Sequence, residues 1–257
     1  MSILESLILA IVEGITEFLP ISSTGHLVLT SKIIGLIQTE FVKSFEISIQ
    51  LGAILAIVVL YWKKFISDTK LLKNLLIAFI PASIIGFFFY SFIKESLIGN
   101  YSVTLLSLFL GGIILIFIEK FLKKSKEKTN NPGNLSFLQS FLIGVFQSVS
   151  VIPGVSRAAA TIIGGLTVGL NRAAATEFSF LLAVPTMLAA TGFDLYKSSS
   201  SFEAPQFSIL GVGFFFSFLT ALLAVKFLIS FVKRHDFKIF GVYRIILAVL
   251  YWVLLMN

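Results

Sequence analysis

The sequence EGITEFLPISSTGH, residues 13–26, decides how the chain folds because it sets polar and charged residues inside a long apolar segment, Ile3–Ile37. The break comes at PISSTGH, residues 20–26. Each half is shorter than the roughly 20 residues that a helix needs to cross the hydrocarbon of a membrane. Non-helical backbone at membrane depth is tolerated only where protein or a wet cavity surrounds it. We therefore expect a helix, a tight polar turn and a second helix, which together form a re-entrant hairpin.

The same pattern recurs later in the chain, where PGVSR, residues 153–157, interrupts the apolar segment Phe137–Leu170. Each broken segment is followed by three apolar stretches that are long enough to span a membrane. These six stretches are Phe45–Trp62, Asn74–Ile93, Ser102–Leu122, Thr176–Leu195, Phe207–Val232 and Lys238–Met256. The sequence thus predicts an all-α membrane protein with six transmembrane helices plus two re-entrant helical hairpins.

The two copies form an internal repeat. FLPISST at 18–24 is echoed by VIPGVSR at 151–157, and a Glu follows the Pro after 26 residues in the first copy (Glu46) and 24 in the second (Glu177). Because three spans are an odd number, the copies must have opposite topology, and inverted repeats bring broken helices together near the membrane midplane. We expect the polar hairpin tips to meet within one domain, residues 1–257. It consists of repeat one (about 1–122), a cytoplasmic basic loop (about 123–136) and repeat two (about 137–257).

Composition supports a membrane protein. Of the 257 residues, 57% are hydrophobic and only 13% are charged, which argues against a soluble globular fold. The chain has no Cys, so neither a disulfide framework nor a thiolate metal site can form. The net charge of +7 comes from basic residues gathered in loops on one side, which the positive-inside rule assigns to the cytoplasm. Nucleic acid is therefore not expected as a partner, and both termini are expected outside the cytoplasm.

Ionisable side chains gather where the hairpins are expected to meet. Each costs about 2.5–3.5 kcal/mol at membrane depth, so such residues mark a functional site by default. They are Glu13, Glu17, His26, Glu46, Arg157 and Glu177. One alone would be read as a structural ion pair, whereas the group on matching elements predicts a wet functional site. Lys226 and Arg244 also lie within apolar stretches, but close enough to an end for their side chains to reach the membrane surface.

Glu13 and Glu17 are four residues apart and share one face of a helix. Two carboxylates on one face repel each other unless a cation lies between them, and Mg²⁺ or Ca²⁺ accepts oxygen ligands of this kind. The alternative is that one carboxyl is protonated or pairs with Arg157. A zinc site is not expected, since thiols are absent and the chain has only two His.

The residues after Pro20 open the second half-helix of the first hairpin. A helix N-terminus with free N–H groups and hydroxyls attracts phosphate, although Ser and Thr are also ordinary helix caps. The corresponding end of the second hairpin carries Ser156 and Arg157, and Arg suits forked phosphate contacts. His26 lies beside the hydroxyls and is a candidate acid or base, with a structural role as the alternative. The expected anion-binding residues of the first hairpin are Ser22, Ser23, Thr24 and Gly25.

Residues 13–26 closely resemble the first signature of the bacterial undecaprenyl-diphosphatase (bacitracin-resistance) family. PGVSR at 153–157, with Thr161, resembles its second signature, and Phe45-Glu46 through Gln50-Leu51-Gly52-Ala53 is similar to the segment after its first hairpin. The resemblance implies an enzyme of the bacterial cytoplasmic membrane that removes the terminal phosphate from undecaprenyl diphosphate. The product is the lipid carrier of peptidoglycan synthesis, and the activity confers bacitracin resistance.

The resemblance also implies roles for single residues. Glu13 and Glu17 would bind a divalent cation, Mg²⁺ or Ca²⁺, or assist proton transfer, while Ser23 would be the nucleophile and His26 the acid or base. Phosphate would be bound by Arg157 together with Ser22, Thr24, Gly25, Gly154, Ser156 and Thr161, with support from Glu46, Gln50 and Glu177. Ala158 departs from the pattern, because many relatives have Ser there. The partners that follow are the polyprenyl diphosphate lipid, membrane lipids and, as an open alternative, a second copy in a homodimer.

A transporter is the rival interpretation, since inverted repeats with broken helices are a transporter architecture. The same fold would then flip polyprenyl phosphate across the bilayer. Ser23 and His26 beside a metal site favour hydrolysis, because transport alone does not need them. Water instead of Ser23 remains the alternative nucleophile.

Overall fold

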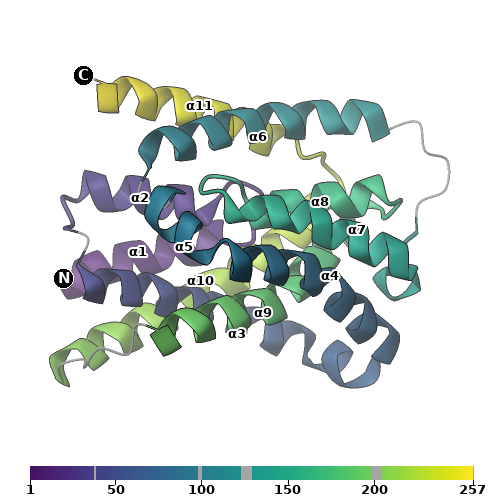
Figure 1. The fold of residues 1–257 in the computed structure, drawn as a ribbon, viewed down its shortest axis with the longest axis horizontal. Coiled ribbons are helices and arrows are strands. Elements are labelled where there is room, and N and C mark those ends of the chain that lie inside the picture. The colour runs from purple at the N-terminus through teal and green to yellow at the C-terminus, as the bar shows by residue number, and fades with distance from the viewer. Residues whose placement is uncertain (38, 98–99, 123–128, 198–203, 257) are drawn as a thin grey trace.

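The structure is a computed structural model that describes residues 1–37, 39–97, 100–122, 129–197 and 204–256. Over these residues the secondary structure is helical, apart from one isolated bridge between Thr129 and Leu170 (Figure 1). A π-helical turn at Ile93–Leu97 and 3₁₀ turns at Pro132–Asn134 and Val149–Val151 join the α-helices. These are α1 (Ile3–Thr16), α2 (Ser23–Ile33), α3 (Glu40–Ser67), α4 (Thr69–Phe88), α5 (Tyr90–Phe92), α6 (Tyr101–Leu122), α7 (Phe137–Ser148), α8 (Arg157–Thr167), α9 (Arg172–Lys197), α10 (Ala204–Val232) and α11 (Lys238–Met256).

Within the described ranges, five helices are long and apolar enough to cross a membrane: α3, α4, α6, α9 and α10. Large apolar side chains such as Trp62, Phe88 and Phe227 are more than half exposed on their outer faces. Lipid is the solvent that suits such surfaces. The protein is therefore a multi-pass membrane protein. The sixth expected stretch forms α11 with the bounds that the sequence predicts.

The junction of α3 and α4 lies outside the apolar ranges expected for these helices. The backbone N–H of Asp68 donates to the carbonyl of Lys64 at 3.1 Å and closes α3. The carboxylate of Asp68 accepts a hydrogen bond from the backbone N–H of Leu71 at 2.9 Å and caps α4. The expected ranges counted apolar residues only. They therefore missed the polar last turn of α3 and the polar first turn of α4, which the Asp68 cap stabilises.

Both broken segments form the expected helix–turn–helix hairpins. In the first, α1 ends at Thr16 and α2 begins at Ser23; in the second, α7 and a 3₁₀ turn lead to Val151, and α8 begins at Arg157. Each hairpin starts with a capping box, Ser2 with Glu5 and Ser136 with Gln139. Local sequence therefore sets both where the hairpins start and where they break.

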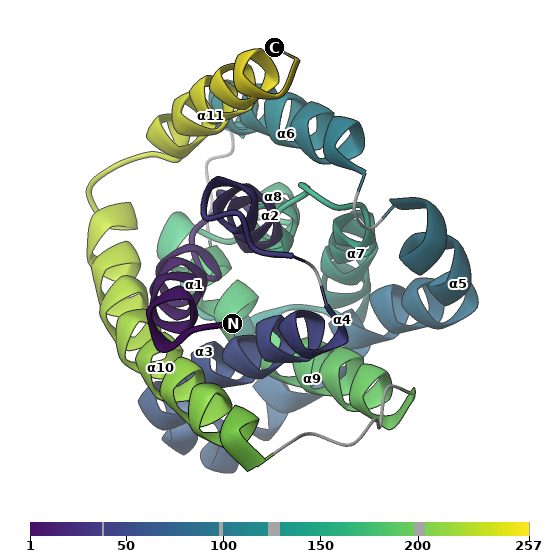
Figure 2. The same ribbon diagram turned by 90° about the vertical axis from the view of Figure 1, so that its left-hand side faces the viewer.

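The first helix of each hairpin packs on a long helix that follows the other hairpin. Helix α1 lies along α10, and α7 lies along α4 (Figure 2). Glycines allow the close approach: a methyl group added at Gly14 would lie 1.9 Å from the Oγ1 of Thr220, and one at Gly144 would lie 2.3 Å from the carbonyl oxygen of Ala78. Helices α3 and α9 also pack together, as do α6 and α11. The two halves are thus interleaved.

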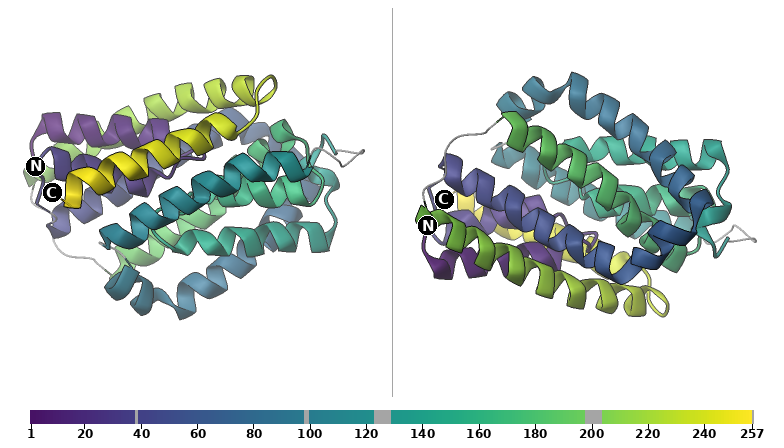
Figure 3. Two further views of the ribbon diagram at one scale, coloured as in Figure 1. Left: turned by 90° about the horizontal axis from the view of Figure 1, so that it is seen from above. Right: turned by 90° about the horizontal axis from the view of Figure 1, so that it is seen from below.

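Both termini lie at one end of the molecule, and the start of α7 lies at the opposite end (Figure 3). Hairpin one therefore opens toward the end that holds the termini, while hairpin two opens toward the other end (Figure 1). An apolar core packs against the tip of hairpin one. Phe18, just before the turn of hairpin one, packs edge-to-face on Phe180 of α9 with ring centroids 5.3 Å apart. This contact anchors the first hairpin tip to the core.

Candidate functional site

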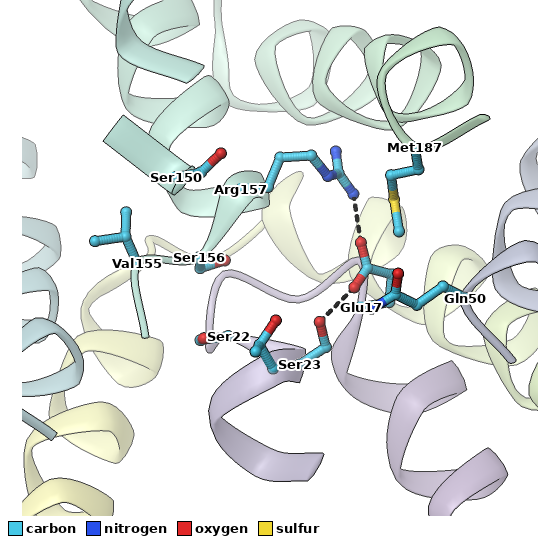
Figure 4. A pocket seen from close by; sticks show the side chains of 10 residues that line it. Glu17, Ser22, Ser23, Gln50, Ser150, Val155, Ser156, Arg157 and Met187 are labelled. Atoms are coloured by element: carbon cyan, nitrogen blue, oxygen red, sulfur yellow. Dashed lines mark hydrogen bonds and ion pairs between the residues drawn. The ribbon is translucent and has the colours of Figure 1, made fainter. Parts of the chain in front are cut away.

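The tips of the two hairpins meet at a polar cavity of about 170 Å³ (Figure 4). Hairpin one supplies a carboxylate and three hydroxyls, and hairpin two supplies two hydroxyls, an apolar side chain and a guanidinium. The lining residues are Glu17, Ser22, Ser23, Thr24, Gln50, Ser150, Val155, Ser156, Arg157 and Met187. The expected meeting of the two tips is therefore found in the structure.

Glu17 connects the two tips. Its carboxylate accepts a short hydrogen bond from the hydroxyl of Ser23 and a charge-assisted one, 3.0 Å long, from the Nη2 of Arg157 (Figure 4). Glu17 is only 7% exposed, so the ion pair is formed away from bulk water. A buried ion pair of this kind is tolerated when further hydrogen bonds satisfy both partners.

Ser22 adopts a strained backbone at the turn of hairpin one. Among the described residues it is the one non-glycine with a positive φ, at 73°. Its hydroxyl accepts a hydrogen bond from the backbone N–H of Gly25 at 3.3 Å, so Ser22 caps α2. Backbone strain of this kind costs on the order of 1–3 kcal/mol and persists where the surroundings impose it, commonly at functional sites.

The second tip presents a helix N-terminus as well. Ser156 caps α8 by accepting from the backbone N–H of Ala159 at 3.1 Å, and Arg157 is the first residue of that helix. The Nη1 of Arg157 donates to the carbonyl of Ser179 in α9 at 2.9 Å, which holds the side chain toward Glu17. Two helix N-termini and one guanidinium thus border the cavity, and each favours an anion.

Glu13 lies one helical turn before Glu17, behind the cavity lining. It is fully buried, and neither of its carboxylate oxygens has a hydrogen-bond partner. It interacts electrostatically with Glu17, Glu46 and Arg157, and its carboxyl lies close enough to that of Glu17 for the two to share a proton. Burying carboxylate oxygens without a partner costs free energy, which binding of a proton or a cation would offset.

The expected cation would lie between Glu13 and Glu17. No cluster of three or more Asp, Glu, His or Cys that could hold a metal occurs within the described ranges. Mg²⁺ is commonly held by one or two carboxylates, while water and substrate phosphate fill its other positions. The two unpartnered oxygens of Glu13 fit that pattern. Both oxygens of Glu17 already accept hydrogen bonds, from Ser23 and Arg157, so a cation would share Glu17 with these groups.

His26 faces α11 rather than the cavity. Its Nδ1 lies 2.7 Å from the carbonyl oxygen of Ser22, and its Nε2 lies 2.8 Å from the hydroxyl of Tyr243. The carbonyl can only accept, so Nδ1 carries the proton and Nε2 accepts from the tyrosine hydroxyl. The backbone N–H of His26 also donates to the carbonyl of Ser22, at 3.2 Å. His26 therefore holds the strained turn from behind.

The other predicted site residues divide into two groups. Ser22, Thr24, Gln50 and Ser156 line the cavity, as predicted. Thr161 is fully buried and donates to the hydroxyl of Ser179 at 2.6 Å, which links α8 to α9.

Glu177 forms a short ion pair with Lys64 near the C-terminal end of α3. Outside the lining are Gly25, Gly154, Thr161, His26, Glu13, Glu46 and Glu177.

Glu46 lies beside hairpin one. Its carboxylate accepts from the hydroxyl of Ser31 in α2 at 3.4 Å. This contact links α2 to α3, and Glu46 also interacts electrostatically with Glu13.

Sequence reasoning missed Ser150, Val155 and Met187 in the lining. Ser150 had a signal, since it precedes Pro153 by the same spacing at which Glu17 precedes Pro20. Arg244 was expected to reach the membrane surface, and this expectation is wrong: it is 1% exposed and hydrogen-bonded in the interior. Helix α11 packs on α6 and turns that side chain inward, which hydropathy does not reveal.

Comparison with known proteins gives a consistent result. The model of the family "Bacitracin resistance protein BacA" matches residues 6–250. A protein of Aquifex aeolicus named undecaprenyl-diphosphatase is 56% identical over 247 residues, which cover 96% of each chain. One of Sulfurihydrogenibium with the same name is 53% identical, covering 98% of this chain and 99% of the relative, and one of Thermus thermophilus is 45% identical, covering 96% and 95%.

Proposed function

This chain belongs to the bacitracin resistance protein BacA family, and on that premise we propose that it hydrolyses undecaprenyl diphosphate to undecaprenyl phosphate and inorganic phosphate. It is a membrane phosphatase that recycles a lipid carrier. The observation that carries the proposal is the contact of Glu17 with both Ser23 and Arg157 where the hairpin tips meet. A base, a hydroxyl and a phosphate-binding cation are thereby assembled in one cavity.

We propose the bacterial inner membrane as its location, with six spans, two re-entrant hairpins and both termini outside the cytoplasm. Residues of about 1–122 and about 137–257 would be inverted repeats within one domain. The interleaved packing supports this, since α1 on α10 has its counterpart in α7 on α4. In this arrangement the cavity lies at membrane depth, where a diphosphate can enter while its polyprenyl tail remains among lipids.

Arg157 and the N-termini of α2 and α8 hold the diphosphate in the proposed complex. Hydroxyls of Ser22, Thr24 and Ser156 line the same cavity and can donate to phosphate oxygens. Phosphoryl transfer depends mainly on positioning and on neutralising charge, so a fixed guanidinium and two helix ends are the groups that it needs.

Ser23 is the proposed nucleophile and Glu17 the base that activates it. The hydroxyl proton of Ser23 passes to Glu17 as Oγ forms a bond to the terminal phosphorus. The bond from that phosphorus to the bridging oxygen breaks, and undecaprenyl phosphate leaves with the electron pair. Water then cleaves the serine phosphate. A phosphoserine trapped at Ser23 by acid quench would support this route, whereas direct attack by water would leave none.

Glu13 and Glu17 are the proposed ligands of a divalent cation, Mg²⁺ or Ca²⁺. When bound, such an ion polarises phosphoryl oxygens and neutralises their charge. The unpartnered oxygens of Glu13 support this assignment, because a cation would satisfy them. His26, whose ring bonds Ser22 and Tyr243, supports the site by fixing the turn that presents Ser23.

Transport is not favoured as the primary activity. The relatives are named for hydrolysis of the diphosphate, and a flippase has no need of the hydrogen bond between Ser23 and Glu17.

Phosphate release from undecaprenyl diphosphate by the purified protein in lipid vesicles tests the proposal. Glu17→Gln and Arg157→Ala should each lower kcat/KM by about 100-fold or more, the usual cost of removing a group that stabilises the transition state. Glu5→Gln is the matched control, because it removes a carboxylate from the same helix while Gln can preserve the capping box. Turnover close to that of the unmodified protein in both site variants would overturn the assignment.

A further inference from the structure

Arg244 of α11 bonds both hairpin tips at once. Arg244 is 1% exposed, and its guanidinium donates four hydrogen bonds to backbone carbonyl oxygens. Nη1 reaches Pro20 in the turn of hairpin one at 3.2 Å, and Nη2 reaches Gly154 in the turn of hairpin two at 3.0 Å. The remaining two bonds go to α6, at Ser107 (3.1 Å) and Leu108 (3.2 Å).

The carbonyls at the tips need such a donor. Carbonyls in a turn between two helices have no intrahelical partner, and at membrane depth no bulk water takes its place. Arg presents five N–H groups in a rigid planar fork, whereas Lys presents three donors from one point. Pro20 and Gly154 lie at the two breaks, and the fork of Arg244 satisfies both carbonyls.

The surroundings make room for this side chain. A methyl group added at Gly111 of α6 would lie 2.2 Å from the Nη2 of Arg244. Gly154 has a φ of 87°, and a methyl group there would lie 2.3 Å from the carbonyl oxygen of Thr104 in α6. Two glycines thus allow the guanidinium and the second tip to lie directly on α6. Burying a charged guanidinium costs free energy, so its retention in the interior indicates that Arg244 has a specific role.

We infer that Arg244 is a positioning residue for the phosphatase, which holds the two hairpin tips at the spacing that lets Ser23 and Arg157 act on one diphosphate. Val155 and Ser156, which line the cavity, directly follow Gly154, and the turn from Pro20 leads directly to Ser22 and Ser23. Arg244 itself does not line the cavity and acts through the backbone. The inference rests on the proposed function.

Three variants of the full-length protein in lipid vesicles test it. Arg244→Lys keeps the charge and loses the fork, while Arg244→Met loses both. Lys226→Met is the control, since it also removes a cation from a long apolar helix, but one that is exposed. For each we would measure kcat and KM for undecaprenyl diphosphate, the Ki of inorganic phosphate as product inhibitor, and the thermal unfolding midpoint.

Arg244→Lys should fold, yet lose about 10-fold to 100-fold in kcat/KM, as small displacements of positioned groups do. Its KM and phosphate Ki should both rise, and Lys226→Met should match the unmodified protein. Wild-type kinetics for Arg244→Lys would overturn the inference. So would a loss that follows the folded fraction alone, with KM and Ki unchanged, because that would mark a purely structural role. If Arg244→Met does not fold, the Lys variant decides. Failure of the proposed function would instead show as no phosphate release by the unmodified protein.

Discussion

Glu17 receives its two hydrogen bonds from different hairpins, Ser23 from the first and Arg157 from the second. Bonds to a charged partner contribute about 1.5–3 kcal/mol each. Removing Arg157 would leave Glu17 as a buried charge without its counter-ion, which typically costs about 3–5 kcal/mol. The ion pair is thus expected to contribute to stability as well as to catalysis. Arg157→Lys keeps the charge, so it separates the effect on catalysis from the effect on stability better than Arg157→Ala does.

His26 and Tyr243 should behave as one unit. Tyr243→Phe removes the hydroxyl that bonds Nε2, and His26→Gln removes the ring that bonds the carbonyl of Ser22. We expect both to lower kcat by about 10-fold, because each loosens the turn that presents Ser23. Steady-state kinetics of the single and double variants would check this, with non-additive losses expected. If His26→Gln were inactive while Tyr243→Phe were fully active, His26 would act directly as acid or base instead.

Glu13 should control the use of a divalent cation. Glu13→Gln keeps the shape of the side chain and removes the charge, so the ion concentration for half-maximal phosphate release should rise about 10-fold or more. Chelation should abolish release by the unmodified protein and be reversed by Mg²⁺ or Ca²⁺. Glu5→Gln, on the same helix, should leave the ion dependence unchanged. An identical ion dependence in Glu13→Gln would remove Glu13 from the ligand set.

At the scale of single residues, the sequence predicted many of the residues that line the cavity, but not their contacts. The sequence placed Glu17 and Arg157 near one meeting point, and their ion pair is the alternative that it left open beside a cation between Glu13 and Glu17. The direction of His26 and the burial of Arg244 were not predictable, since both depend on how α11 crosses α6. Helix crossing follows from packing across the whole fold, which local patterns do not encode.

Among the elements, the glycine contacts between interleaved helices decide how closely they approach. Gly14→Ala would place a methyl group 1.9 Å from the Oγ1 of Thr220 and 2.5 Å from the backbone oxygen of Ser217. We expect destabilisation by about 1–3 kcal/mol, the usual cost of overpacking. Thermal unfolding in detergent would measure it.

Gly86→Ala in α4 is the matched control, since no atom lies within 4 Å of the added methyl group. It should be neutral or stabilise by up to about 1 kcal/mol through helix propensity. Equal stability of the Gly14 and Gly86 variants would mean that α1 and α10 do not approach closely at Gly14.

The hairpins themselves could be predicted from sequence because Pro, Gly and Ser mark each break and capping boxes mark each start. The ends of α3 and α4 could not, since Asp68 caps α4 while Lys64, Lys70 and Lys73 continue these helices beyond their apolar parts. The length of an apolar stretch reflects the thickness of the membrane that it crosses, whereas hydrogen bonding at the caps determines the residue at which a helix ends.

For the molecule as a whole, the absence of Cys from the sequence means that its orientation in the membrane can be measured by labelling single introduced cysteines. Ser2→Cys lies at the end of the molecule that holds the termini, and Ser67→Cys lies where α3 meets α4. In intact cells made permeable only at the outer membrane, an impermeant maleimide should label Ser2→Cys alone. Ser67→Cys should react only after the inner membrane is opened. The reverse pattern would place the termini in the cytoplasm.

The sequence predicts a repeat, but it does not predict that the helices of the two halves interleave. Order and spacing of apolar stretches predict how many times a chain crosses, and charge predicts which side a loop faces. That α1 lies on α10 and α7 on α4 follows from contacts between residues distant in sequence, such as Gly14 with Thr220.

The unlike tips have a consequence for symmetry. Two identical half-length chains, associated about a two-fold axis, would present the same set of residues at both tips, so any acid–base pair between the tips would occur twice. Here the first tip supplies the acidic residue, Glu17, and the second supplies the basic residue, Arg157. Joining the halves in one polypeptide is what permits this difference, because each tip can then change on its own. In the proposed mechanism this difference gives the two tips separate roles: the first tip supplies the attacking hydroxyl, and the second binds the phosphate.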